Sequence, residues 1–213
     1  MSKPLIKICG ITRMEDALIC ASLGIQALGF NFYDKSPRYI SPNDAATIIE
    51  GLPPTIWTVA LFVNSPLTRV NEILNITKAN TIQLHGDEDC DYLKQLPNIR
   101  KIKALRLKDN LTLKGLNSWT GISDFLLFDT WQADQFGGSG KELNEEIFAG
   151  IPEEAKRRIL SKSFIAGGIT PENINCKIKS FQPFGLDIAS GVESSPGVKN
   201  HLLIAQLMGK LSL

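Results

Sequence analysis

The residues Leu5-Ile6-Lys7-Ile8-Cys9-Gly10-Ile11-Thr12 begin as an apolar run and end in a cysteine, a glycine and a threonine. Such a run predicts a buried β-strand over residues 5–9, followed by a loop. The loop lacks the G-x-G-x-x-G pattern that follows the first strand of a dinucleotide-binding domain. This difference counts against a doubly wound open sheet, which is the main structural alternative for a chain that alternates strands and helices.

Short apolar runs of the same kind recur along the chain, and segments with helical periodicity separate them. The further strand candidates are residues 27–32, 58–63, 81–85, 101–105, 125–129, 163–166 and 185–189. The helix candidates include residues 13–23, 42–51, 66–76, 88–95, 144–150, 171–179 and 199–211. A strand followed by a helix, eight times over, predicts a closed parallel (β/α)8 barrel, the TIM-barrel member of the α/β class.

The composition is that of a soluble globular protein that can bury a large core. The chain has 213 residues, of which 43% are hydrophobic and 21% charged, and we expect residues 1–213 to form one barrel domain. The formal net charge of +1, without a long Lys/Arg run, excludes the usual footprint of nucleic-acid and membrane-surface binders. No signal peptide and no apolar run of about 20 residues is recognisable, so we expect a cytoplasmic protein.

The four cysteines, at positions 9, 20, 90 and 176, show neither a C-x-x-C pair nor a Cys/His cluster at zinc spacing. We therefore expect free thiols, no structural or catalytic metal and no redox dithiol. The sequence predicts an enzyme without a cofactor that acts on a small molecule, as a monomer or a homodimer.

Polar residues and glycines gather where the predicted strands end, and catalytic groups of this barrel lie at the carboxyl ends of its strands. In chain order these are Cys9-Gly10, Asn31, Ser36-Pro37-Arg38, Asn64, Gln83, His85-Gly86, Arg106, Asp129, Gly167-Gly168 and Ser190-Gly191. The pattern predicts one ring of loops around a single mouth.

The loops after the seventh and eighth strands carry Gly167, Gly168, Ser190 and Gly191. Glycines let backbone N–H groups approach an anion closely, and the commonest phosphate site of this fold lies at these two loops. Either loop alone could simply turn the chain, but the pair predicts a phosphate site and hence a phosphorylated substrate.

A further glycine-rich segment, Gly137-Gly138-Ser139-Gly140, follows the sixth strand. Gln135 stands where a P-loop needs its first glycine, and Glu142 follows Lys141 where a P-loop needs Ser or Thr, so this is not a nucleotide-binding P-loop. The segment is either a loop that closes over the ligand or an ordinary flexible connection.

Cys9 and Asp129 each end an apolar strand. A buried thiol often acts only as a small hydrophobe, and an aspartate in this position can simply cap a helix. In an eight-stranded ring, however, the first and sixth strands are three steps apart, and their ends face each other across the mouth. An acid and a base on opposite sides of one substrate suit a proton-transferring isomerase.

Seven motifs in order resemble the phosphoribosylanthranilate isomerase family of tryptophan biosynthesis, a family with the (β/α)8 fold. They are Lys7-Ile8-Cys9-Gly10-Ile11-Thr12, Gly29-Phe30 with Ser36-Pro37-Arg38, Leu61-Phe62-Val63-Asn64, Gln83-Leu84-His85-Gly86, Phe128-Asp129 with Gly137-Gly138-Ser139-Gly140, Ala166-Gly167-Gly168, and Asp187-Ile188-Ala189-Ser190-Gly191-Val192-Glu193. The resemblance runs from Lys7 to Lys199. Two positions depart from the family pattern: Ser139 replaces the usual threonine, and Ala189 replaces the more usual serine.

The resemblance implies an aldose–ketose isomerase that performs an Amadori rearrangement of phosphoribosylanthranilate. It implies that Asp129 is the general acid, Cys9 the general base and Arg38 the group that binds the anthranilate carboxylate. Gln83, His85 and Asp187 are further candidates for substrate binding, and for His85 and Asp187 a structural hydrogen-bonding role is the alternative.

Both catalytic groups begin in the wrong protonation state, because a free thiol is mostly protonated at neutral pH and a free aspartate is almost fully ionised. Lys7, which shares its face of the strand with Cys9, is the one nearby residue that would favour a thiolate.

Two other functions remain open on the sequence alone. One is the related histidine-pathway isomerase, which uses an aspartate where Cys9 stands. The other is a noncatalytic sensor of a phosphorylated ligand, whose signature would be loss of Cys9 or Asp129, and both are present.

Overall fold

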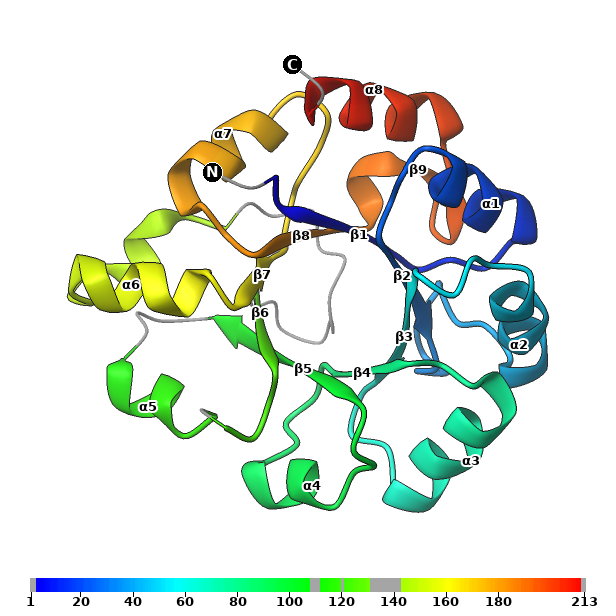
Figure 1. Ribbon diagram of the computed structural model, residues 1–213, viewed down its shortest axis with the longest axis horizontal. Coiled ribbons are helices and arrows are strands. Elements are labelled where there is room, and N and C mark those ends of the chain that lie inside the picture. The colour runs from blue at the N-terminus through cyan, green and yellow to red at the C-terminus, as the bar shows by residue number, and fades with distance from the viewer. Residues whose placement is uncertain (1–2, 108–111, 120, 131–142, 212–213) are drawn as a thin grey trace.

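Eight short apolar segments form a closed ring of parallel strands in the computed structural model, which describes residues 3–107, 112–119, 121–130 and 143–211 (Figure 1). The strands are β1 (Leu5–Cys9), β2 (Ala27–Asn31), β3 (Trp57–Phe62), β4 (Thr81–Leu84), β5 (Arg100–Leu107), β6 (Phe125–Thr130), β7 (Ser163–Ile165) and β8 (Gly185–Ile188). The ring closes where β1 pairs with β8, in a register that sets Lys7 opposite Asp187. The predicted barrel is therefore confirmed, and the open sheet is excluded.

The helices surround the ring, one after each strand (Figure 1). They are α1 (Met14–Ser22), α2 (Pro42–Glu50), α3 (Leu67–Thr77), α4 (Cys90–Lys94), α5 (Leu113–Asn117), α6 (Glu153–Leu160), α7 (Ile174–Phe181) and α8 (His201–Leu211). Two 3-10 turns, η1 (Glu145–Phe148) and η2 (Ser190–Val192), and a short hairpin of β9 (Glu193–Ser195) and β10 (Val198–Lys199) complete the fold. Among the described residues, no helix has the length and hydrophobicity needed to cross a membrane.

Local capping explains where several helices begin. Ser41 precedes α2, and its hydroxyl accepts a hydrogen bond from the backbone N–H of Asp44, while Pro42 occupies the first helical position. Asp89 caps α4 in the same way by accepting from the N–H of Tyr92. Lys78 ends α3 in the left-handed conformation, with φ of 54°.

One helix expectation was wrong, and a second was too long. The segment 144–150 forms only the turn η1, and the helix that follows it is α6, whose sequence Glu-Glu-Ala-Lys-Arg-Arg-Ile-Leu is mostly charged. Of this helix only Leu160 is fully buried, so its apolar stripe is too narrow to be recognised by periodicity. The segment 88–95 contracts to α4, because the carboxylate of Glu88 bonds to the side chain of Lys103 and to backbone N–H groups of neighbouring loops.

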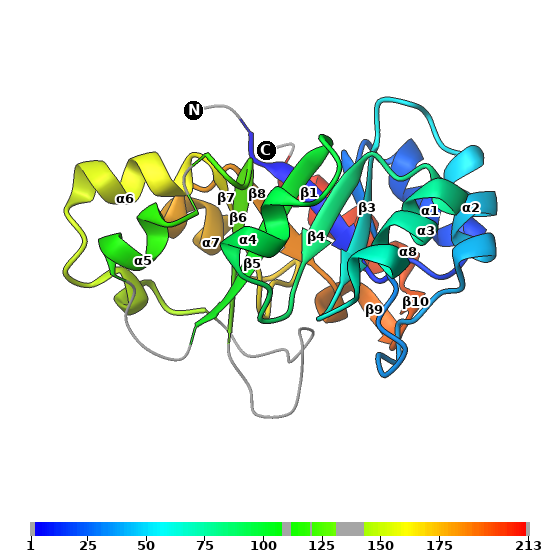
Figure 2. The ribbon, with the colours of Figure 1, turned by 90° about the horizontal axis from the view of Figure 1, so that it is seen from below.

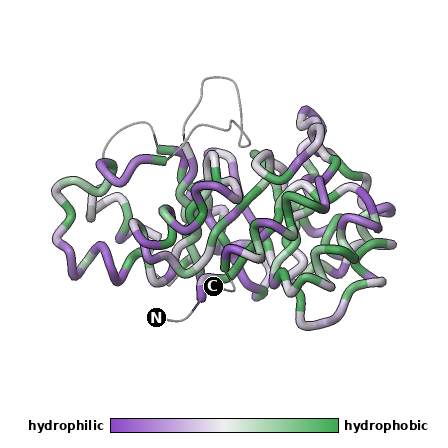
Figure 3. Tube along the Cα trace, turned by 90° about the horizontal axis from the view of Figure 1, so that it is seen from above, coloured by the Kyte–Doolittle hydropathy of each residue, from purple (hydrophilic) through white to green (hydrophobic). Residues whose placement is uncertain are grey.

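The strands bury both of their faces, as a parallel barrel requires. Ile6 and Ile8 of β1 pack in the large cluster between the ring and the helices, whereas Lys7 and Cys9 alternate with them and point inside the ring. Hydrophobic colour runs along the central strands in Figure 3, and hydrophilic colour gathers in outer turns and loops.

Aromatic side chains fill the interior at the amino ends of the strands. Phe125 and Phe184 have ring centroids 4.5 Å apart, and Phe164 meets both of them edge-on, at 5.9 and 5.5 Å. Trp57 completes the group, and the guanidinium carbon of Arg100 lies 3.6 Å from the centre of its ring. Aromatic rings therefore fill this end of the barrel, and the predicted site residues lie at the other end, where Figure 2 shows the β9–β10 hairpin.

Candidate active site

Cys9 ends β1 inside the ring and is part of a buried group with Lys7, Gly29 and Asp187. The Lys7 Nζ donates a hydrogen bond to Asp187 Oδ1 at 2.7 Å, across the seam between β1 and β8. A Cβ at Gly29 of β2 would lie 2.8 Å from the Cys9 Sγ and 3.0 Å from the Lys7 Nζ. The missing side chain of Gly29 thus leaves the space in which the thiol and the ammonium meet.

Burial and neighbouring charges have opposite effects on the pKa of Cys9 and of Lys7. Burial raises the pKa of the Cys9 thiol above its ordinary value, although Lys7 acts to lower it. Burial also works against the Lys7 ammonium, but the Asp187 carboxylate and the Cys9 sulfur together raise the pKa of Lys7. At neutral pH the free protein therefore holds an ammonium–carboxylate pair beside a protonated thiol.

Asp129 lies near the carboxyl end of β6 and is 3% exposed, with a histidine beside it. Its Oδ1 accepts from the backbone N–H of Thr130 at 2.8 Å, and its Oδ2 lies 3.3 Å from the His85 Nε2. The His85 Nδ1 lies 3.2 Å from the Gln83 Nε2. The structure therefore brings together three of the predicted site residues from β4 and β6.

Two polar atoms in this second group are buried without a hydrogen-bond partner among the described residues. They are the His85 Nε2, which is not aligned for a hydrogen bond with Asp129, and the Gln83 Oε1. Buried polar atoms are almost always satisfied in folded proteins, so unpartnered atoms at a strand end point to a bound polar molecule. Because β1 and β6 are three steps apart in the ring, the groups of Cys9 and Asp129 lie on opposite sides of the mouth.

Arg38 lies close to the end of β1 but is held by an acidic partner. Its Nε and Nη2 donate to the carboxylate of Glu193 at 3.0 and 2.7 Å. A Cβ at Gly10, whose φ is +79°, would come within 2.6 Å of the Arg38 Cδ, so the arginine needs a glycine at the end of β1. The same Glu193 carboxylate accepts from the Lys199 Nζ at 2.7 Å.

The three charges of this network are buried. Burial disfavours the Glu193 carboxylate, but hydrogen bonds from Arg38 and the charge of Lys199 lower its pKa below the ordinary value. Burial lowers the pKa of Lys199 and outweighs its attraction to Glu193. The Lys199 Nζ also donates to the backbone carbonyl of Cys9 at 2.5 Å. The network therefore connects the arginine with the backbone of the cysteine.

The two loops predicted to hold phosphate lie against each other. Gly167 and Gly168 follow β7 with φ of 90° and 60°, a region that other residues rarely adopt. Gly191 follows β8 so closely against the carbonyl of Ile169 that a Cβ there would collide with the carbonyl oxygen. Ser190 opens the turn η2 beside this contact. The loops after β7 and β8 thus form one continuous backbone surface at the mouth.

The remaining predicted loop, Gly137, Gly138, Ser139 and Gly140, lies outside the described residues.

Two residues of the network around Arg38 were not predicted from the sequence as site residues. Glu193 gave only a local signal, as the last residue of the Ser190-Gly191-Val192-Glu193 motif, and Lys199 gave none, because its partner Cys9 is 190 positions away.

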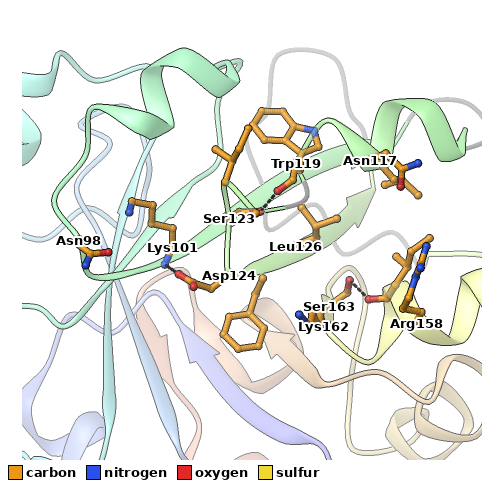
Figure 4. A pocket seen from close by; sticks show the side chains of 15 residues that line it. Asn98, Lys101, Asn117, Trp119, Ser123, Asp124, Leu126, Arg158, Lys162 and Ser163 are labelled. Atoms are coloured by element: carbon orange, nitrogen blue, oxygen red, sulfur yellow. Dashed lines mark hydrogen bonds between the residues drawn. The ribbon is translucent and has the colours of Figure 1, made fainter.

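A cavity of about 540 Å³ lies elsewhere, on the outside of the ring between α5 and α6. Figure 4 shows Lys101, Trp119, Arg158 and Lys162 around it. Its lining, from segments 98–126 and 158–163, contains none of the predicted site residues among those the structure describes.

The chain is similar to known proteins of one family along almost its whole length. Residues 6–210 match the model of the family described as N-(5'phosphoribosyl)anthranilate (PRA) isomerase. The chain is 42% identical to the N-(5'-phosphoribosyl)anthranilate isomerase of Pelobacter propionicus over 203 residues, which are 95% of this chain and 93% of that one.

Solved structures give the same result. The phosphoribosyl anthranilate isomerase of Thermus thermophilus is 32% identical, superposes with a TM-score of 0.83 and covers 97% of this chain and 98% of its own. A phosphoribosyl anthranilate isomerase solved in complex with reduced 1-(o-carboxyphenylamino)-1-deoxyribulose 5-phosphate is 31% identical, with a TM-score of 0.79 and 98% of both chains covered.

Proposed function

Because the chain belongs to the N-(5'-phosphoribosyl)anthranilate isomerase family, an isomerase family of tryptophan biosynthesis, we propose that it rearranges N-(5'-phosphoribosyl)anthranilate. The product is 1-(2-carboxyphenylamino)-1-deoxyribulose 5-phosphate, and the reaction is an Amadori rearrangement that converts an aldose derivative into a ketose. One observation carries the assignment of the chemistry: Cys9 and Asp129, both buried, lie at the carboxyl ends of opposing strands of one ring.

In the first step a protonated Asp129 gives its proton to the ring oxygen of the ribose. The bond between C1' and that oxygen breaks, and the nitrogen lone pair forms a C1'=N double bond. The position of Asp129 at the end of β6, buried in the mouth with His85 3.3 Å from its carboxylate, supports this role.

In the second step the Cys9 thiolate removes the proton from C2', and the electron pair moves toward nitrogen to give an enolamine. The enolamine then loses the proton of its C2' hydroxyl and gains one at C1', which yields the ketone. No redox change and no cofactor are needed.

Other residues would hold the two ends of the substrate. Arg38 keeps a planar cation at the mouth, and a guanidinium suits the anthranilate carboxylate. The paired backbone loops at Gly167, Gly168, Ser190 and Gly191 suit the phosphate. Gln83 and His85 offer the unpartnered polar atoms near Asp129 to the sugar hydroxyls.

The test is steady-state turnover of phosphoribosylanthranilate by purified protein. Cys9→Ser and Asp129→Asn should each lower kcat at least about 100-fold with little change in KM, since general acid and base groups typically contribute that much. Cys176→Ser, at an exposed cysteine, is the matched control and should keep full turnover.

Two results would point to another function. Equal turnover of the histidine-pathway aminoaldose would contradict the proposed specificity. A chain that binds a product analogue but does not restore growth without tryptophan to a strain lacking the isomerase would be a sensor and not an enzyme.

A further inference from the structure

We propose that Lys7 is the positioning residue that allows Cys9 to lose its proton, and that Asp187 balances the charge of the Lys7 ammonium while Cys9 is protonated. The inference rests on the proposed function, because it concerns the base of that reaction. It assigns to Asp187 a role on Lys7 and not on the substrate.

The geometry begins with the alternation of β1. Lys7 and Cys9 are two residues apart, so their side chains point to the same side of the strand, into the ring. The ammonium of Lys7 donates at 2.7 Å to the carboxylate of Asp187, and it borders the same space as the Cys9 sulfur. Gly29 supplies the space, because a Cβ there would lie within 3.0 Å of both the sulfur and the Nζ.

The other charges around Cys9 are already committed to partners. Arg38 is paired with Glu193 through two donors, and Lys199 donates to Glu193 and to the backbone carbonyl of Cys9. Of these three cations in the described part of the chain, Lys7 is the one whose Nζ borders the space left by Gly29 together with the Cys9 sulfur. A thiolate buried to this degree is costly unless a cation lies against it.

Lys7 and Asp187 act on Cys9 in opposite directions. The ammonium favours the thiolate, and the carboxylate, which balances the ammonium while Cys9 is protonated, disfavours it. A pair that only held β1 to β8 would stabilise the fold without affecting the titration of Cys9. The proposal instead requires that removing Lys7 and removing Asp187 shift the titration midpoint of Cys9 in opposite directions.

The experiment titrates the thiolate directly, by its ultraviolet absorbance against the same variant carrying Cys9→Ser. Lys7→Met should move the titration midpoint of Cys9 upward by at least about one pH unit, and Asp187→Asn should move it to lower pH. Lys103→Met is the matched control, since Lys103 is a buried, ion-paired lysine that bonds Glu88 at 2.8 Å and lies away from Cys9. It should leave the titration unchanged.

The activity of Lys7→Met should follow the titration. At neutral pH its kcat should fall about tenfold for each pH unit by which the titration midpoint of Cys9 rises, and it should recover as the pH is raised, while KM stays similar. A loss that is the same at every pH would show a structural role only and would overturn the proposal.

The double variant Lys7→Met/Asp187→Asn guards against misfolding, because it leaves no unpaired charge inside the barrel. Its titration should move upward by less than that of Lys7→Met alone. A folded Lys7→Met or Asp187→Asn variant that titrates like the wild type overturns the proposal. Failure of the proposed function would look different: Cys9→Ser would keep its turnover, whatever the titration of Cys9 showed.

Discussion

Arg38 is the residue whose surroundings the structure defines most sharply. A guanidinium that donates through Nε and Nη2 to one carboxylate is fixed in its plane, and Glu193 is in turn fixed by Lys199. Arg38 would therefore meet an incoming carboxylate in a set orientation, and the acidic partner acts as its support.

Replacing Glu193 by Gln should loosen this support. Hydrogen bonds to charged groups contribute about 1.5–3 kcal/mol, so we expect the KM for phosphoribosylanthranilate to rise about tenfold or more, with a smaller change in kcat. Steady-state kinetics measure both constants. Glu72→Gln, which breaks a surface pair with Arg69, is the control for charge alone. A fall confined to kcat would argue that Glu193 does not act through Arg38.

At the scale of single residues, the sequence predicted on which strand or loop a side chain lies, but not the residue to which it bonds. Cys9 and Asp129 lie at or next to strand ends, as the sequence predicts, and Arg38 lies in the loop after β2. The bond between Lys199 and Cys9, and that between Arg38 and Glu193, join residues 190 and 155 positions apart. Only the closed ring brings such residues together.

Among the elements, β3, β6, β7 and the residue that precedes β8 close the amino end of the barrel with aromatic rings. Phe164 of β7 is fully buried, and its ring meets Trp57, Phe125 and Phe184 edge-on. Gly185 of β8 makes the space for this ring, since a Cβ there would lie 2.6 Å from the Phe164 Cε1.

Phe164→Ala should therefore lower the free energy of unfolding by about 3–5 kcal/mol, the usual cost of removing a buried aromatic side chain. Chemical denaturation measures this loss. The turnover per folded molecule should change little, because the cavity opens at the end opposite to Cys9 and Asp129. Phe184→Leu, which keeps an apolar side chain beside the ring, should cost less. A large drop in turnover without loss of stability would contradict this separation of the two ends.

Periodicity in the sequence predicted the strands better than the helices. Most strands give short apolar runs, and all eight were predicted to within two residues of their observed ends. The helix α6 was missed because it rests on the barrel through Leu160 and a few partly buried residues, and its sequence is otherwise charged. The short helix α5 was missed as well.

For the molecule as a whole, alkaline pH should be destabilising through its buried thiols and phenols. Burial raises the pKa of Cys20 in α1 from 9.0 to about 12, and burial likewise raises the pKa of Tyr92 from 10.0 to about 12. Between those values the unfolded chain releases protons that the folded chain keeps. The contribution of Cys20 to stability is therefore full below pH 9 and falls by about 1.4 kcal/mol for each pH unit as the pH rises toward 12. The partly exposed Tyr92 adds a smaller loss above pH 10.

Denaturation curves across this range test the prediction on Cys20→Ala. The variant should lose less stability than the wild type between pH 9 and pH 12, because it lacks one of the ionising groups. Cys176→Ala, at an exposed position, should follow the wild-type slope. If Cys20→Ala and the wild type showed parallel curves, burial of the Cys20 thiol would not be the cause.

The pairing of β1 with β8 has a consequence for the protein during its synthesis. The partner of Lys7 is Asp187, 180 positions later, so the ribosome must reach β8 before the first strand can complete its bonds. Until then β1 can pair with β2 along one edge only, and Cys9 and Lys7 lack Asp187 and Lys199. Contacts between such distant segments also form slowly. The groups around Cys9 are therefore assembled only when β8 pairs with β1. The same pairing ends the exposure of these strands to chaperones and proteases.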